Sequence, residues 1–123
     1  MKRDMDLVRS ILLKLEEHEH GRAPVPLVID GYTEEQIGYH VYLMDEAGLL
    51  IALKTQSRGS TSPCAIPMRM TWAGHDFLDA ARSDTIWKAA KQRLAESVGW
   101  VSFEVFKSVL VVLAKENLGL PGG

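Results

Sequence analysis

One predicted helix, residues 33–48, constrains the fold of this chain more than any other segment. Thr33 can accept a hydrogen bond from a free backbone N–H of the first turn, and Glu34 and Glu35 lie where the helix dipole favours negative charge. Helical spacing brings Ile37, His40, Val41, Met44 and Ala47 onto one face. This pattern predicts a helix with one side against a core.

The residues after this helix predict a turn and a β-ribbon. Gly48 can adopt the positive φ that ends a helix. Residues 49–54 and 66–71 are predicted strands, separated by a polar loop rich in turn-forming residues. A helix, a tight turn and a strand in this order are typical of a winged helix, where the recognition helix meets the wing. The predicted class is therefore α+β, a winged helix with a shortened helix-turn-helix and a three-stranded wing sheet.

The N-terminal part departs from the usual helix-turn-helix. Residues 4–18 form an amphipathic helix with Asp4 as its N-cap. Gly21, Pro24 and Pro26 then leave no room for the additional helix that a helix-turn-helix needs. Residues 27–29 are predicted to be the third strand of the wing sheet.

The C-terminal part is predicted to be helical. Thr71 caps a helix whose inward side chains are Trp72, Phe77, Leu78 and Ala81. Ser83 or Asp84 starts the next helix, and residues 103–117 form the last one. We expect a winged-helix domain at 1–82 and a helical extension at 83–123 that packs on it and supports dimerisation.

Composition narrows the function classes only slightly. The 123 residues carry a net charge of −2, which gives no overall attraction to nucleic acid or to an acidic membrane. A lone cysteine, Cys64, fits a reducing compartment. No apolar stretch approaches the ~18 residues of a spanning helix, and the N-terminus is not a signal peptide. The expectation is a cytoplasmic protein with no membrane partner.

Four segments resemble the family called domain of unknown function 2513. They are Met1–Asp6, Gly31–His40, Glu46–Leu50 and Met70–Arg82, of which the Thr-Trp-Ala-Gly-His-Asp-Phe-Leu-Asp run is the most specific. The resemblance extends over nearly the whole chain. The resemblance implies a small bacterial protein, often carried by phages and prophages, with a winged-helix-like fold. It supplies no activity and no catalytic residues.

A transcription-regulator-like DNA contact, if present, is expected through the wing. The central helix has four acidic residues and no Lys or Arg between 33 and 48, which opposes phosphate contacts. The wing carries Lys54, Arg58 and Arg69 with no acidic residue between positions 47 and 75. An Arg at a wing tip can enter a narrow minor groove. The alternative is that Arg58 is an ordinary solvated loop residue, which the spread of the three charges over sixteen positions favours.

Protein contacts are the competing hypothesis. Tyr39 and Tyr42 lie on the outward face of the central helix, where an adaptor could use them, unless the C-terminal helices cover them. The last helix is apolar on two sides, so it either runs through the monomer or pairs with a second copy. We expect a homodimer, with contacts from the last helix: Phe103, Phe106, Val109 and Leu113.

No enzyme, metal or cofactor is expected. His18 and His20 are two residues apart, a spacing that points side chains in different directions on a helix. His40 is expected in the core, and His75 is expected to bond locally at a helix start. No nucleophile is paired with a base and no phosphate-binding loop is present in the sequence.

Overall fold

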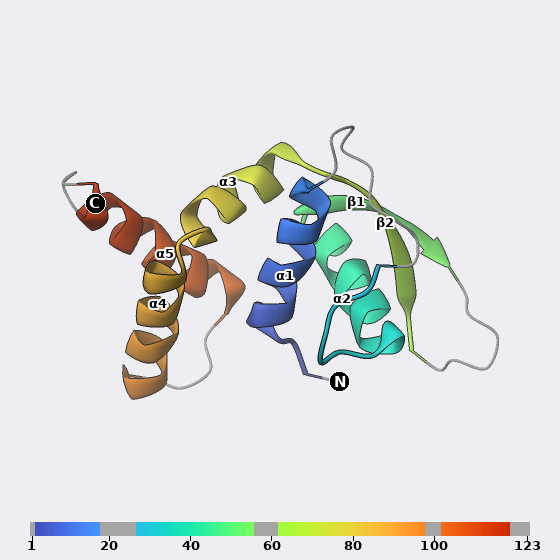
Figure 1. Cartoon of the computed structure of the whole chain (residues 1–123), viewed down its shortest axis with the longest axis horizontal. Coiled ribbons are helices and arrows are strands. Elements are labelled where there is room, and N and C mark those ends of the chain that lie inside the picture. Colours follow the sequence, from blue (N-terminus) through green and yellow to red (C-terminus); the bar gives the residue numbers. More distant parts are fainter. Residues whose placement is uncertain (1, 18–26, 56–61, 98–101, 119–123) are drawn as a thin grey trace. The chain divides into compact units, whose positions relative to one another are not determined.

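The computed structural model describes residues 2–17, 27–55, 62–97 and 102–118, coloured in Figure 1. Within them are five helices and a two-stranded antiparallel sheet, a mixed α+β composition. The chain divides into two compact units, Met1–Asp76 and Phe77–Gly123. The loop tip that holds Arg58, and the segment with His18 and His20, lie outside the described residues.

Helix α1, Met5–Glu16, confirms the predicted first helix and its cap. The Asp4 carboxylate accepts hydrogen bonds from the backbone N–H groups of Asp6 and Leu7, at 2.9 and 3.2 Å. These bonds satisfy two of the donors that a helix start leaves open. Leu7, Ile11 and Leu12, on the apolar face of α1, are fully buried.

Helix α2, Glu34–Glu46, confirms the predicted central helix. Thr33 and Gln36 form a reciprocal capping box at its start, with bonds of 2.8 and 3.1 Å. Gly48 ends the helix at φ 80°, a conformation that residues with a side chain rarely adopt. Ile37, Val41 and Met44 face the core, as the helical spacing predicted.

Buried His40 connects the start of α1 to α2, and the prediction of a core histidine is confirmed. The backbone N–H of Asp4 donates to His40 Nε2 at 2.9 Å. Nε2 must therefore be unprotonated, and Nδ1–H donates to the Gln36 carbonyl at 2.8 Å. Asp4 also accepts from the Tyr32 hydroxyl at 2.8 Å, so one residue joins three separate segments.

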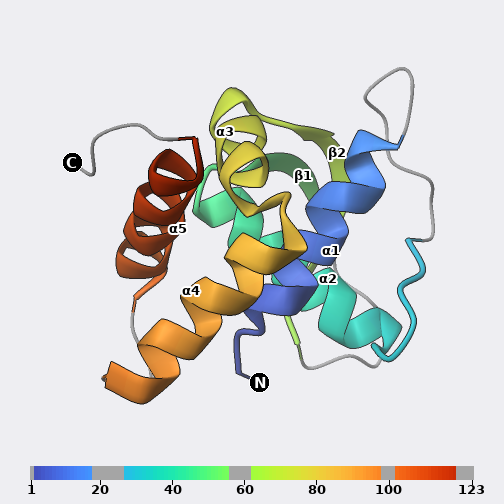
Figure 2. The same cartoon turned by 60° about the vertical axis from the view of Figure 1, so that its left-hand side comes forward.

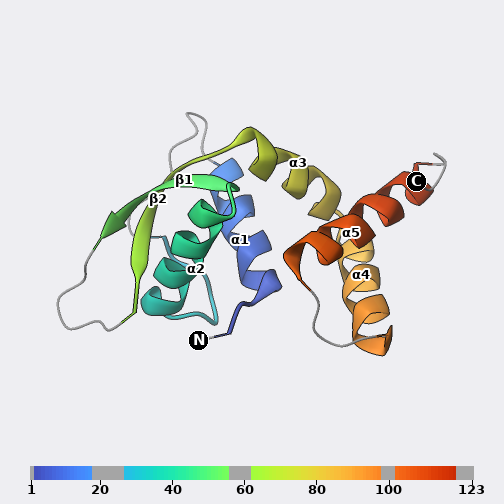
Figure 3. The same ribbon diagram turned by 180° about the vertical axis from the view of Figure 1, so that it is seen from behind.

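Strands β1, Leu50–Thr55, and β2, Cys64–Met70, form an antiparallel ribbon. Helix α2 packs on one face of this ribbon, and α1 packs against α2 (Figures 1 and 3). Ala52 pairs with Pro67 and Ile51 with Arg69, which leaves Met68 as the extra residue of a β-bulge.

The predicted third strand, residues 27–29, is wrong. This segment has no strand conformation and the sheet has two strands in the described chain. Leu27 and Ile29 are buried and Val28 is exposed, so the alternation of side chains is real. The backbone instead enters a turn at Asp30–Gly31, closed by a bond from Tyr32 N–H to the Ile29 carbonyl, which leads directly into α2.

The ribbon is closed at the point where α2 ends and α3, Trp72–Ala81, begins. Thr71 N–H donates to the Leu49 carbonyl at 3.1 Å, and the Thr71 hydroxyl donates to the Gly48 carbonyl. The same hydroxyl oxygen accepts from Gly74 N–H at 3.0 Å and caps α3, as predicted. Gly74 lies so close that a Cβ there would overlap the Leu49 carbonyl.

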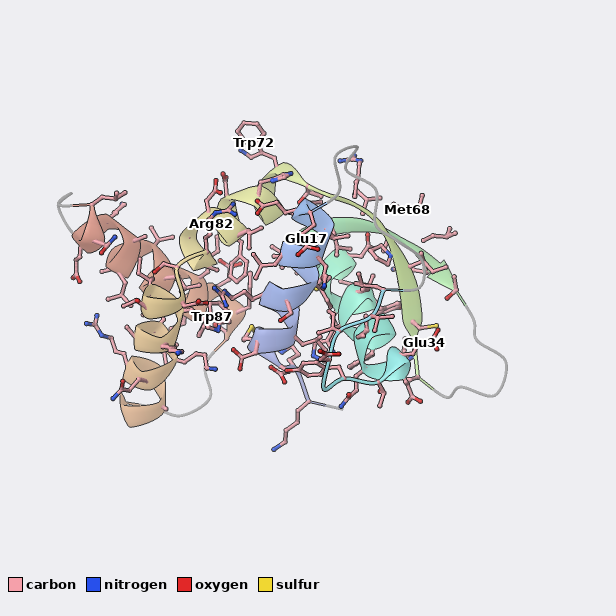
Figure 4. The ribbon with its side chains drawn as sticks, viewed as in Figure 1. Glu17, Glu34, Met68, Trp72, Arg82 and Trp87 are labelled. Atoms are coloured by element: carbon pink, nitrogen blue, oxygen red, sulfur yellow. The ribbon has the colours of Figure 1, made fainter. Side chains whose placement is uncertain are left out.

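The prediction that Trp72 faces inward is wrong, because its side chain is 84% exposed. The buried residues of α3 are Gly74, Phe77, Leu78 and Ala81. At about 100° per residue, Trp72 lies roughly 180° from Ala81 around the helix. The close approach of Gly74 to the ribbon fixes this rotation, and Trp72 therefore points to solvent (Figure 4).

The second unit is built around an aromatic cluster. It contains helices α4, Asp84–Ser97, and α5, Phe103–Asn117, which pack on one another (Figure 2). The Phe77 ring contacts those of Trp87 and Phe103, and Trp87 meets Phe106 with ring centroids 5.0 Å apart. Such edge-on and tilted contacts stabilise a core beyond the area they bury.

Replacing Gly74 with Ala tests the junction between the ribbon and α3. In an exposed helix this change stabilises by about 1 kcal/mol. Here the added methyl collides with backbone, so we expect a loss of about 1–3 kcal/mol in the free energy of unfolding, measured by urea denaturation. Ala73→Ser, on the exposed side of α3, is the control and should change stability by less than about 0.5 kcal/mol. A stabilised Gly74→Ala variant would contradict the close packing.

Tyr32 gives the fold a pH dependence in alkaline solution. Burial, and then the hydrogen bond and charge of Asp4, raise the pKa of Tyr32 to about 12. The unfolded chain releases this proton near pH ~10. The contribution of Tyr32 is therefore complete below pH ~10 and is lost as pH rises toward about 12. We expect the stability difference between wild type and Tyr32→Phe to shrink over this interval. A constant difference in urea denaturation would contradict the prediction.

Candidate interaction surface

The side of the ribbon that faces away from α2 is largely apolar. We call it the ribbon face; its residues are Ile51, Leu53, Ile66, Met68 and Arg69. Leu53 is 58% exposed, Met68 46% and Ile51 42%. Leu53 pairs with Ile66 and Ile51 with Arg69, and cross-strand partners project to the same side. Figure 4 shows Met68 on this ribbon.

Strand alternation and the bulge together create this surface. Leu50 and Met70 pair with each other and are buried on the α2 side. The extra residue in β2 interrupts the alternation, so that Met68 and Arg69, which are neighbours in sequence, are both exposed.

Both edges of the ribbon are blocked near its middle. Ala52 N–H donates to the Asp45 carboxylate at 3.1 Å instead of pairing with β2. Its partner Pro67 therefore belongs to a non-hydrogen-bonded pair, and the N–H that proline lacks falls on the free edge of β2. An additional strand could not pair with the Ala52 N–H at one edge, because this group already donates to Asp45. At the other edge, Pro67 has no N–H to donate.

Lys54 and Arg69 do not form one cationic patch. The Lys54 ammonium lies 4.7 Å from the centre of the Tyr42 ring and 4.0 Å from the Asp45 carboxylate, so it points toward α2. Ile51 lies three residues before Lys54 in the strand and projects from the other face, together with its partner Arg69. The third predicted wing cation, Arg58, lies outside the described residues.

The two tyrosines of α2 are both half-buried. Tyr42 is partly covered by Lys54 of β1, while the Tyr39 ring stands edge-on to His40 with centroids 6.1 Å apart. From the sequence, we expect the C-terminal helices to cover these tyrosines if they are covered. For Tyr42, one covering residue is Lys54 of the ribbon.

The predicted contact residues of α5 have different environments. Phe106 is buried and Phe103 half-buried, and both contribute to the aromatic cluster of the second unit. Val109 and Leu113 are half-buried. The phenylalanines therefore pack within their own chain, and the valine side is the more open one.

Other chemistry-bearing groups are dispersed. His75 is exposed on the first turn of α3, and Cys64 contacts the Thr55 hydroxyl at 3.2 Å. No group of three potential metal ligands occurs among the residues that the structure describes. None of the helices in the described ranges has the length and apolar content needed to cross a membrane.

The sequence interpretation missed the ribbon face. The continuous apolar run Leu49–Leu53 predicts a buried strand, and this prediction is wrong for Ile51 and Leu53, which are exposed and alternate with the less exposed Ala52. Alternation of Met68 and Met70 with Arg69 predicts that both methionines are buried, and the bulge makes this wrong for Met68. The residues at 49–53 are all apolar, so their sequence has no period-two pattern that could have found the surface.

Asp45 should contribute more to stability than Lys54. Asp45→Ala leaves Ala52 N–H without its acceptor, and we expect a loss of about 1–2 kcal/mol in urea denaturation. Lys54→Met removes a partly exposed ion pair and the contact of the ammonium with the Tyr42 ring, and should change stability by less than about 1 kcal/mol. Equal losses from the two variants would show that the ion pair, not the backbone bond, holds β1.

Comparison with known proteins supplies a family. Residues 2–100 match the family model described as "Hypothetical protein (DUF2513)". The chain is 35% identical over 119 residues to an uncharacterized protein of Haemophilus influenzae. The aligned region covers 96% of this chain and 99% of the relative. No solved structure matches the chain. The resemblance seen in the sequence is confirmed, and the chain belongs to the family of domain of unknown function 2513.

Proposed function

We propose that this protein is a non-enzymatic binding module that docks another protein on its ribbon face. The observation that carries the proposal is the exposure of Ile51, Leu53 and Met68 on one side of a two-stranded ribbon. Exposed apolar side chains that gather on one surface are typical of protein interaction sites. We propose further that α2 and the ribbon form a winged-helix-like arrangement in which the wing serves protein recognition.

The chemistry of the ribbon face indicates what its partner should offer. The surface is apolar except for exposed Arg69. The complementary partner surface is therefore an apolar patch with a carboxylate positioned to meet Arg69. Because Asp45 and Pro67 block the strand edges, we expect side chains of the partner to pack on the face instead of a strand pairing with the backbone.

The DNA-binding alternative receives less support from this geometry. Lys54 lies beside Asp45, on the opposite face from Arg69, so its charge is partly compensated. The solvent side of α2 carries Glu34, Glu35 and Glu46, all exposed, which would repel phosphates. We retain protein binding, the function expected from Tyr39 and Tyr42, but we propose that the ribbon face, and not these tyrosines, makes the contact.

Charge insertion on the ribbon face tests the proposal. The chain is cross-linked to its partners in its native host, and each partner found with wild type is compared across variants. We expect Leu53→Asp and Met68→Asp each to lower the captured amount at least tenfold, because both bury a charge in an apolar contact. Thr85→Asp, at an exposed position of α4, is the matched control and should retain the partner.

Two outcomes would contradict the proposal. One is a partner that is retained by Leu53→Asp and Met68→Asp while both variants remain folded. The other is a partner that is lost only on Tyr39→Ala or Tyr42→Ala, which would return the contact to α2. Urea denaturation of every variant separates loss of binding from loss of folding.

Fluorescence anisotropy with duplex DNA tests the alternative function separately. At about 50 mM salt, where nonspecific binding is near its strongest, we expect no binding at micromolar concentrations of the chain. Binding that weakens with salt and with Arg58→Ala or Arg69→Ala would instead establish the wing as a DNA contact. Lys88→Ala, which removes an exposed cation of α4, is the control for total charge.

A further inference from the structure

Helix α5 carries a row of valines on its open side. Val105, Val109 and Val112 follow one another at spacings of four and three residues, which places them in one line along the helix. Val105 is 47% exposed, and Val109 and Val112 are half-buried. The buried residues of α5, Phe106 and Leu110, lie on a different side. We call this row the valine stripe.

We infer that the valine stripe pairs with the same stripe of a second copy of the chain, with the two α5 helices antiparallel. Spacings of four and three are those of the apolar seam between paired helices. A two-fold axis near Val109 brings Val105 of each copy close to Val112 of the other. A contact of this kind uses one surface twice and closes at two copies.

The charges beside the stripe select the antiparallel orientation and a second copy as the occupant. Glu104 and Lys115 lie on the same flank of the valine stripe, about 20° apart around the helix. Around an axis at Val109, Glu104 of one copy comes within one residue, about 1.5 Å along the helix, of Lys115 of the other. The two pairs form symmetrically. A parallel pair would instead leave Glu104 and Lys115 of the other copy eleven residues, about 16 Å, apart along the helix, so the two charges would not pair.

The stripe is separate from the surfaces already described. Phe103 and Phe106 are engaged with Phe77 and Trp87 of their own chain, so dimerisation does not need to open the aromatic cluster. The ribbon face belongs to the first unit and shares no residue with the valine stripe. Failure of one proposal would therefore leave the other standing.

Sedimentation equilibrium of the full chain tests the pairing. A short seam buries less than the roughly 800 Å² per partner of a standard interface, so we expect a dimer that forms at around 100 μM. Val109→Glu should leave a folded monomer up to about 500 μM. The matched control is Ala89→Glu on the exposed side of α4, which should dimerise like wild type. A monomeric wild type at this concentration, or a Val109→Glu variant that still dimerises, would overturn the inference.

Charge reversal tests the orientation. Glu104→Lys and Lys115→Glu should each weaken the dimer about tenfold at low salt, because two attractive pairs become repulsive. The double variant restores the pairs and should return close to wild-type affinity. Lys88→Glu on α4 is the control for net charge. Single reversals without effect, or a double variant as weak as the sum of the two, would exclude the antiparallel arrangement.

Discussion

The carbonyl groups of Gly48 and Leu49 hold the first unit together at the point where three elements meet. Helix α2 ends there, β1 departs, and Thr71 returns from β2 to donate to both carbonyls. The positive φ of Gly48 turns the chain sharply enough to make this possible. Gly74 then lets α3 start against the same carbonyls without a side chain in between. The start of β1 and the end of β2 are thus fixed to one another at the Gly48 and Leu49 carbonyls.

This closure determines which surfaces of the ribbon are available. The side toward α2 is occupied by buried Leu50 and Met70, and one edge is bound by Asp45 through Ala52. Pro67 denies a donor to the other edge. The remaining surface is the ribbon face, which is exposed to solvent on the side of the ribbon opposite to α2. A flexible loop could present the same side chains, but it would lose more conformational entropy when a partner bound.

Local signals in the sequence were sufficient for most of the secondary structure. Capping by Asp4, Thr33 and Thr71 located helix starts within a residue, because these side chains bond to backbone groups nearby in sequence. Apolar spacing also identified His40 as a core residue. Its partner Asp4 is 36 positions away, so the bond itself could not be predicted.

Features that depend on distant contacts were missed or misjudged. Helical spacing alone places Trp72 roughly 180° from Ala81, so its outward orientation could have been predicted, and the approach of Gly74 to Leu49 then fixes the rotation of α3. Alternation in residues 27–29 fits a strand, but pairing requires a neighbour that the sequence does not reveal. Lys54 was counted as a free wing cation because its neutralising partner Asp45 belongs to another element.

The central claim is that the ribbon face is open in the free protein. Paramagnetic broadening of methyl resonances by a soluble gadolinium chelate tests it most directly, because broadening falls steeply with distance from solvent. The account predicts strong broadening for Ile51, Leu53 and Met68 and little for the buried methyls of Ile37, Met44 and Leu50. Protection of Ile51, Leu53 and Met68 to the level of the core would contradict it, since another part of the chain would then already cover the surface.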